Sequence, residues 1–318
     1  MKINKLLINL FGVSLAAWTV GCETIIDVDL PEHEPALVIN SIFGTNDTTF
    51  VIGVYETKGI LEGNDFGYYE DEQRIDGAIV ELFEDGNSIG FAIQDETRDY
   101  TLNYEPKTEK TYSISVFKDG FTTASSLDMA PEVNESLTIE ELSFQEMREY
   151  VYRIDLTYSF EDPIDQNYYQ VEVYEEEPYY EYYDDEDTSY YINLGMRRNT
   201  IYYTEEGANL DEFSDNEESP IISDELFNGK KFTKKIYFHY NNYNYYEDTV
   251  FNEERKIYLE LRTLSDPYYN YSISRQKQIN TNQNPFAEPA PVYNNIENGY
   301  GVFAGYGSYL LTIDVENE

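Results

Sequence analysis

From Ala36 onward, short runs of alternating hydrophobic and polar residues are separated by turn residues. A period of two is typical of strands with one buried face, and no long stretch shows the 3.6-residue period of an amphipathic helix. Asp85-Gly86-Asn87 and Asp119-Gly120 suit hairpin turns, which need a positive φ. We therefore expect an immunoglobulin-like β-sandwich over residues 34–131. Its predicted strands are Leu37–Ile42, Phe50–Tyr55, Ala78–Phe83, Ser88–Ile93, Tyr100–Tyr104 and Thr111–Phe117.

A second, larger β-rich domain is predicted over residues 132–318. Its clearest strand is Tyr150–Phe160, where Tyr, Ile, Leu and Phe alternate with Val, Arg, Asp, Thr and Ser. The period changes near 266–280, where Ser265 is a candidate N-cap and Asp266-Pro267 suits a first helical turn, so we expect a helix there. Further predicted strands are Tyr168–Tyr174, Asn199–Tyr203, Phe232–Tyr240, Lys256–Leu261 and Tyr309–Val315.

Three segments of this second domain are predicted to be loops. Residues 175–187 and 205–218 are too acidic for a core, and 282–307 is rich in Pro, Asn and Gly. The predicted class is therefore mainly β, with an N-terminal sandwich, a larger β domain and about one helix.

Residues 1–21 have the pattern of a secretory signal peptide, with Lys2 and Lys5 before a short apolar stretch. The stretch ends in Thr19-Val20-Gly21-Cys22, which resembles a bacterial lipobox. We expect cleavage before Cys22 and acylation of its sulfur with chains such as palmitate, followed by an acidic tether over residues 22–33. The alternative is a plain signal peptide with an incidental cysteine.

The charge and the rare residues exclude several function classes. Against 62 Asp and Glu stand 21 Lys and Arg, a formal net charge of −41, which opposes binding to nucleic acid. With one cysteine and two histidines, the chain has no disulfide framework, thiolate zinc site or histidine-rich metal centre. It also lacks Gly-x-Ser-x-Gly, His-Glu-x-x-His and glycine-rich phosphate motifs. We therefore expect a protein that is not an enzyme.

The acidic segment 175–187 contains two candidate sites. Asp184, Asp185 and Asp187 could supply oxygen ligands to calcium, the one cofactor considered, although the spacing of an EF-hand is absent. The alternatives are a solvated acidic loop and contact with a basic partner. The tyrosines of the same segment could stack against a glycan or a peptide, or could be ordinary strand residues. These candidate ligand-binding residues are Tyr179, Tyr180, Tyr182 and Tyr183.

Several segments together resemble an uncharacterised family of Bacteroidota outer-membrane lipoproteins whose domain has no assigned function. The matching segments are Cys22–Glu23, Ile25–Leu30, Pro31–Asn40, Gly77–Leu82, Glu84–Gly86, Lys110–Val116, Asp119–Phe121, Asn284–Ile296 and Gly299–Tyr306.

The resemblance implies a lipid-anchored accessory subunit of a TonB-dependent transporter, or of a related outer-membrane assembly, that acts in ligand capture or complex assembly. The implied partner is an outer-membrane β-barrel, and the cell surface is favoured over the periplasmic face. The alternative function is an autonomous surface module that binds a glycan or a cation. Residues 284–307 are the candidate contact surface for the barrel, with Gly299, Gly301 and Gly305 serving tight backbone turns in the competing structural interpretation. The candidate contact residues are Phe286, Glu288, Tyr293, Tyr300 and Phe303.

Overall fold

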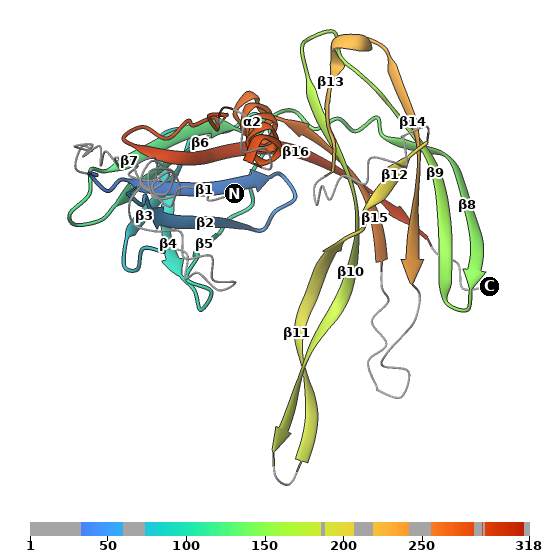
Figure 1. Ribbon diagram of the computed structural model, residues 1–318, viewed down its shortest axis with the longest axis horizontal. Coiled ribbons are helices and arrows are strands. Elements are labelled where there is room, and N and C mark those ends of the chain that lie inside the picture. The colour runs from blue at the N-terminus through green and yellow to red at the C-terminus, as the bar shows by residue number, and fades with distance from the viewer. Residues whose placement is uncertain are drawn as a thin grey trace, which may run out of the picture. The chain divides into compact units, whose positions relative to one another are not determined.

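Two β-sheets carry the fold in the computed structural model, which describes residues 33–59, 74–185, 188–206, 219–241, 256–282, 288 and 290–314 (Figure 1). The first strands are β1 (Leu37–Gly44), β2 (Thr49–Glu56), β3 (Ile79–Glu84), β4 (Asn87–Gln94), β5 (Tyr100–Asn103), β6 (Thr111–Phe117), β7 (Ala124–Met129) and β8 (Thr138–Arg148). The later strands are β9 (Val151–Glu161), β10 (Tyr168–Asp185), β11 (Thr188–Thr200), β12 (Tyr203–Glu205), β13 (Ile221–Ser223), β14 (Lys231–Asn241), β15 (Lys256–Leu264) and β16 (Gly299–Ile313).

Among the described residues, the larger sheet has 12 strands and brings the first and last of them side by side. Its order is β11-β10-β15-β16-β1-β2-β5-β4-β3-β6-β7, with β13 beside β10. Strand β16 runs parallel to β1 from Leu37↔Gly299 to Gly44↔Tyr306, and antiparallel to β15 on its other edge. The smaller sheet has the order β12-β14-β9-β8.

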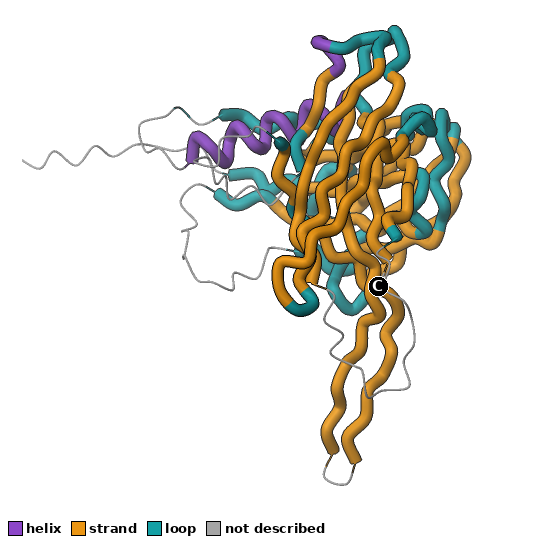
Figure 2. Tube along the Cα trace, turned by 90° about the vertical axis from the view of Figure 1, so that its right-hand side faces the viewer, coloured by secondary structure: helices purple, strands orange, loops and turns teal. Residues whose placement is uncertain are grey.

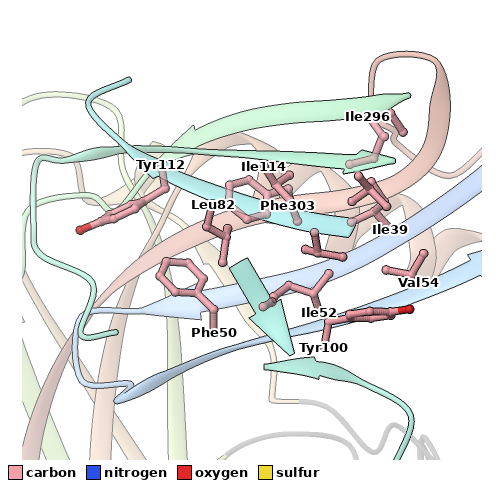
Figure 3. Close-up of a cluster of buried hydrophobic side chains, with 14 of the residues drawn as sticks. Ile39, Phe50, Ile52, Val54, Leu82, Tyr100, Tyr112, Ile114, Ile296 and Phe303 are labelled. Carbon is pink, nitrogen blue, oxygen red and sulfur yellow. The ribbon is translucent and has the colours of Figure 1, made fainter. Parts of the chain in front are cut away.

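The first hydrophobic core lies among β1 to β7 and also takes in residues from the end of the chain (Figure 3). Phe43, Phe50 and Tyr112 are almost fully buried, with ring centroids 5.0 to 5.5 Å apart. Phe303 of β16 joins them, 4.9 Å from Phe43. Aromatic pairs at such distances add to the free energy of burial, so this cluster stabilises the sandwich.

The second core is sandwiched between the smaller sheet and the strands β10 and β15. Figure 2 shows that strands make up most of the described chain. On β9, alternate residues Ile154, Leu156, Tyr158 and Phe160 are all buried, as their period of two predicts. On the neighbouring strand β14, Ile236, Phe238 and Tyr240 lie in register with this face of β9 and join the same core. Ile313 places β16 in this core as well. Strand β16 contributes side chains to both cores, and residues 35–318 form one unit by contact. The domain boundary at 131–132 stays a prediction.

Strand β16 approaches other backbone segments too closely for ordinary side chains. A Cβ on Gly305 would lie 2.7 Å from the Met129 carbonyl oxygen, and one on Gly301 would lie 2.1 Å from the Ile39 oxygen. Gly301 also has a φ of 109°. These positions therefore require glycine, because β16 packs closely against the backbone of β1 and of the end of β7.

Helix α2 (Asp266–Asn282) is the α-helix of the described residues, beside a short 3₁₀ turn, η1 (Asp224–Leu226). Ser265 caps it as predicted, since its hydroxyl accepts a hydrogen bond from the Tyr268 N–H at 3.3 Å. Within the described part of the chain, no helix has the length and hydrophobicity needed to cross a membrane.

The mainly β class with one helix is confirmed, and the layout is compatible with a sandwich. Three local predictions are wrong. Residues 175–185 continue β10, residues 299–307 belong to β16, and the predicted strand Asn199–Tyr203 contains the break between β11 and β12. Residues 186–187 and 207–218 of the two predicted acidic loops lie outside the described residues. Strands β7, β8 and β13 and most of β11 were not predicted.

Candidate functional site

A cleft of about 500 Å³ lies between helix α2 and four strands of the large sheet, β1, β2, β10 and β16. The side chains that line it are mainly hydroxyl, amide and aromatic, with two carboxylates and one guanidinium. The lining residues are Asn40, Ser41, Ile42, Val51, Gly53, Tyr55, Asp99, Gln170, Glu172, Tyr268, Tyr271, Ser272, Arg275 and Val302.

Helix α2 forms one wall because its first turns pack on the sheet. Tyr268 is 7% exposed and contacts the apolar cluster that includes Val302 and Ala304 of β16. Its hydroxyl lies 3.2 Å from Gln170 Oε1 on β10, so it also has a polar partner. The N-cap is itself fixed, since the Ser265 hydroxyl donates to Asp128 on β7. The wall is therefore held by both packing and hydrogen bonds.

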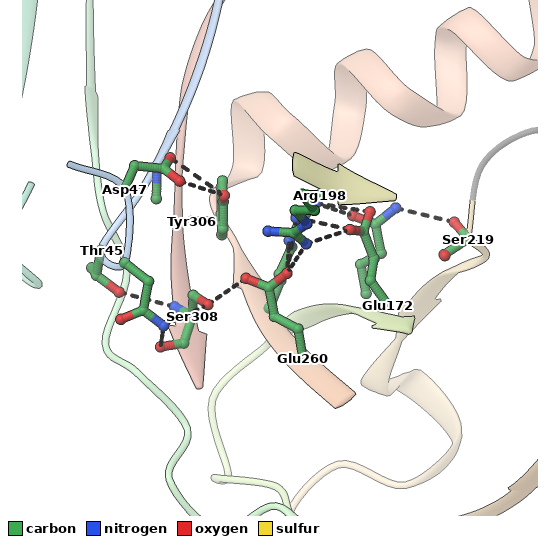
Figure 4. Close-up of polar contacts among 12 residues, drawn as sticks. Thr45, Asp47, Glu172, Arg198, Ser219, Glu260, Tyr306 and Ser308 are labelled. Atoms are coloured by element: carbon green, nitrogen blue, oxygen red, sulfur yellow. Dashed lines mark hydrogen bonds and ion pairs between the residues drawn. The ribbon is translucent and has the colours of Figure 1, made fainter. Parts of the chain in front are cut away.

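A network of buried ion pairs lies behind Glu172, at the β10 side of the cleft (Figure 4). Arg262 of β15 donates to both oxygens of Glu172, each at 2.8 Å. It also donates to Glu260 Oε2 from Nε at 3.1 Å and from Nη2 at 2.9 Å. Arg198 of β11 donates to both glutamates. Two guanidinium groups thus compensate two carboxylates in a region where isolated charges would be costly.

The electrostatic balance of this network is visible in Glu260. Burial tends to raise the pKa of its carboxyl group, but Arg262 and Arg198 outweigh that effect and hold the pKa below its ordinary value. The rings of Tyr174 and Tyr306 add cation–π contacts, 3.5 Å from Arg198 and 4.6 Å from Arg262. The Glu260 carboxyl group is therefore held in its ionised form inside the protein.

The loop between β1 and β2 closes the other end of the network. Asp47 accepts a hydrogen bond from the Gly44 N–H at 2.6 Å and lies 3.4 Å from the Tyr306 hydroxyl. Burial raises the pKa of Asp47 above its ordinary value. Asn46 donates to Ser308, whose hydroxyl donates to Glu260. The network thereby connects β1, β10, β11, β15 and β16.

Chemically, the cleft can hold a polar ligand. The charge of Glu172 is already compensated by arginines, so the groups available to a ligand include tyrosine rings and hydroxyl and amide groups. Tyr55 and Tyr271 are only partly buried, and Ile42 and Val51 are 37% and 48% exposed. Such a combination of flat rings and hydrogen-bonding groups is suited to ligands that present both apolar faces and hydroxyls.

The predicted tyrosine site lies on a β-hairpin and not in a loop. Strands β10 and β11 pair from Tyr174↔Thr200 to Asp185↔Thr188, and tyrosine suits such pleated surfaces. Tyr179 is 40% exposed, with the Arg197 guanidinium 5.0 Å from its ring, whereas Tyr180 is 7% exposed. Tyr182 and Tyr183 follow in the same strand, opposite Tyr191 and Tyr190. Neither Tyr179 nor Tyr180 is among the described side chains that line the cleft.

The predicted cation site is divided between described and undescribed residues. Asp184 and Asp185 lie at the end of β10, opposite Ser189 and Thr188, and Asp187 lies outside the described residues. Among the described residues, no cluster of three or more His, Cys, Asp or Glu side chains is arranged to hold a metal ion. The calcium interpretation stays a prediction.

The predicted contact residues for a barrel do not share one environment. Tyr300 is 56% exposed on β16 and Glu288 is exposed, while Tyr293 is partly buried. Phe303 is fully buried in the first core, so its side chain is not accessible to a partner in this structure. Cys22 and Phe286 lie outside the described residues.

Sequence reasoning missed the cleft and its ionic network. A signal exists in the run Leu259-Glu260-Leu261-Arg262, because the two charged residues share one face of a strand bounded by leucines. Their partners, however, come from positions about 60 to 90 residues away in the chain. Such pairing depends on the order of strands in the sheet, which the alternation of residues does not encode.

Comparison with protein families identifies the chain as a member of one. The profile described as "Domain of unknown function (DUF4249)" matches residues 23–309, and the chain belongs to this family. No curated protein matches the chain.

Two similar solved structures are crystal structures of Salmonella alpha-2-macroglobulin, one reacted with methylamine and one of a mutant. The first is 12% identical over 74% of this chain, with a TM-score of 0.21, and the second 10% identical over 90%, also with 0.21. The matches cover only 14% and 15% of those longer chains.

Proposed function

We propose that this protein is a lipid-anchored, non-enzymatic accessory subunit of an outer-membrane transporter and that it acts in ligand capture.

 Its binding site is the cleft beneath α2. The protein holds a polar, hydroxyl-rich ligand there and presents it to a β-barrel partner of the TonB-dependent class at the cell surface.

The observation that carries the proposal is the composition of the cleft. Tyr55 and Tyr271 offer partly buried rings, and Asn40 and Ser272 offer an amide and a hydroxyl group around them. The volume of about 500 Å³ is typical of small-molecule sites. A hydroxyl-rich ligand such as an oligosaccharide can stack on such rings and exchange hydrogen bonds with such groups.

The lipobox at Thr19–Cys22 supports the membrane anchorage of the proposal. The barrel partner is inferred from the resemblance to outer-membrane lipoproteins described above. The cleft also favours a second candidate function, an autonomous surface module that binds a glycan without a dedicated transporter.

Ligand capture is tested by calorimetry of the purified lipoprotein in detergent against a panel of oligosaccharides. We expect at least one to bind, and Tyr271→Ala to weaken its affinity about fivefold or more, equivalent to about 1 kcal/mol. Tyr300→Ala is the matched control, since Tyr300 is 56% exposed and does not line the cleft. Absence of binding across the panel, or equal losses in both variants, would count against the cleft as the site.

The partner is tested by affinity purification of the tagged lipoprotein from its own membranes in mild detergent. We expect a TonB-dependent barrel at comparable stoichiometry by mass spectrometry. Recovery of the lipoprotein alone, together with oligosaccharide binding, would favour the autonomous module.

A further inference from the structure

Strand β8 forms one edge of the smaller sheet, where it pairs with β9 (Figure 1). No strand of the described residues pairs with its other edge. Ten of its eleven residues are exposed, so the side chains on both of its faces are largely uncovered. An edge of this kind presents unpaired backbone N–H and C=O groups to another strand.

The face of β8 that continues the second core is apolar but uncovered. Leu142 and Phe144 lie opposite Leu156 and Ile154 of β9, which are both fully buried. Leu142 itself is 36% exposed and Phe144 is 41% exposed. The opposing sheet therefore covers the apolar face of β9 but leaves the same face of β8 accessible to solvent.

The protection of this edge is confined to its ends. The register of β8 against β9 shifts between Ile139 and Glu141 and again between Glu146 and Arg148, and such irregularities discourage pairing. Glu140, at the first irregularity, forms an ion pair with Lys231 at 2.6 Å. Between them, residues 141–146 keep a regular register, a length of about 20 Å in a strand.

We propose that residues 141–146 of β8 accept an extended strand from a partner protein in which apolar and basic residues alternate. The apolar residues of that strand would cover Leu142 and Phe144 while its backbone pairs with β8. Its basic residues would lie on the other face of β8, near Glu141, the exposed carboxylate on that face at the start of the segment.

The charge of the chain favours this occupant over a second copy. Each copy has a formal net charge of −41, and association of two such copies is opposed by their mutual repulsion. A basic strand is attracted by the same field. This inference does not depend on the cleft, so it can be tested separately from the proposed function.

The test uses the intact lipoprotein in detergent and a fluorescein-labelled synthetic peptide in which Lys and Val alternate over ten residues. A control peptide of equal charge has proline in place of every second valine, which removes backbone donors and prevents strand pairing. We expect the alternating peptide to bind at least tenfold more tightly by fluorescence anisotropy. Equal affinity of the two peptides would overturn the proposal, because charge alone would then account for binding.

Two variants locate the site. Phe144→Ser should weaken binding of the alternating peptide at least fivefold, whereas Leu226→Ser, at a residue that is 93% exposed on η1, should change it less than twofold. Both side chains are exposed, so both variants should fold. Amide hydrogen exchange should slow in residues 138–148 when the peptide binds. Equal effects of the two variants, or protection elsewhere only, would overturn the proposal.

Self-association is the remaining outcome. If light scattering shows a dimer that Phe144→Ser abolishes, the occupant of the β8 edge is a second copy, and the proposed basic partner strand is wrong.

Discussion

Arg262 shows how a single buried residue holds distant strands together. Its guanidinium is 10% exposed and bonds to Glu260, which is 2% exposed, and to Glu172. Replacing the pair with apolar groups can be nearly neutral, but removing only the cation leaves two carboxylates without their main partner.

We expect Arg262→Met to lower the free energy of unfolding by about 3 kcal/mol or more. Arg153→Met is the control, because its ion pair with Asp155 is 32% and 24% exposed and contributes about 1 kcal/mol or less. Urea denaturation of both variants measures the difference. Similar losses would show that the network around Arg262 adds little to stability.

The lowered pKa of Glu260 also predicts a dependence of stability on pH. A carboxyl group whose pKa is lower in the folded state than in the unfolded state stabilises the folded protein at pH values above its ordinary pKa of 4.5. That contribution is lost as the pH falls through the pKa of the folded state. Asp47 has the opposite sign, since its pKa is raised and its protonation in acid favours the folded state.

We therefore expect the difference in unfolding free energy between the wild type and Glu260→Gln to shrink as the pH falls below 4.5. Urea denaturation at a series of pH values between neutrality and the acid range measures this difference. A difference that stays constant with pH would contradict the lowered pKa.

At the scale of elements, strands were predictable where one face is buried and the other is wet. The alternation of Tyr150–Phe160 predicted β9, which spans Val151–Glu161, and Ser265 predicted the start of α2. Residues 175–185 did not read as a strand, because their strongly acidic composition suggested a solvated loop, although their pairing with β11 makes them one. Residues 299–307 did not read as a strand either, because the glycines of β16 conceal its alternation.

The site was less predictable than the strands. The cleft requires β1, β2 and β10 to lie on one side of α2, and this arrangement follows from the insertion of β16 between β15 and β1. A parallel pairing between the first and last strands of the described chain cannot be inferred from local patterns, because residues more than 250 positions apart take part.

Gly305 tests how closely β16 must approach β7. A side chain at this position would contact the backbone of Met129 and Ala130, at 2.7 and 3.0 Å for the first carbon atom. We expect Gly305→Val to lower the unfolding free energy by about 3 kcal/mol, at the upper end of the usual cost of overpacking. Thermal or urea unfolding measures this loss of unfolding free energy.

Gly86→Val is the control for a glycine with open space around it, although its φ of 79° adds some local strain. A loss no larger than that of Gly86→Val would show that β7 yields to the added side chain, because Gly305, unlike Gly86, has no positive φ to add strain.

At the scale of the whole molecule, two cores share β16 and the ionic network bridges the strands on either side of it. Perturbation of β16 is therefore expected to reach both cores, whereas perturbation of the exposed edge β8 should leave them intact. This separation is what allows the β8 edge and the cleft to be tested by different variants.

The attachment of the molecule to a membrane depends on one side chain, Cys22, in the proposed scheme. Each buried methylene of an acyl chain contributes about 0.8 kcal/mol, so several chains on one residue suffice for stable anchoring. When cells that produce the wild-type protein grow with an alkyne analogue of palmitate, we expect the protein to incorporate this analogue and its mature chain to begin at Cys22. Cys22→Ser should incorporate none and should retain residues 1–21 by intact mass, because cleavage before the lipobox cysteine requires its acylation. Thr19→Leu is the matched control, since it changes the same segment but keeps the sulfur, and it should be labelled like the wild type. Labelling of Cys22→Ser would place the acyl chains elsewhere and would remove the lipobox as the basis of the anchor.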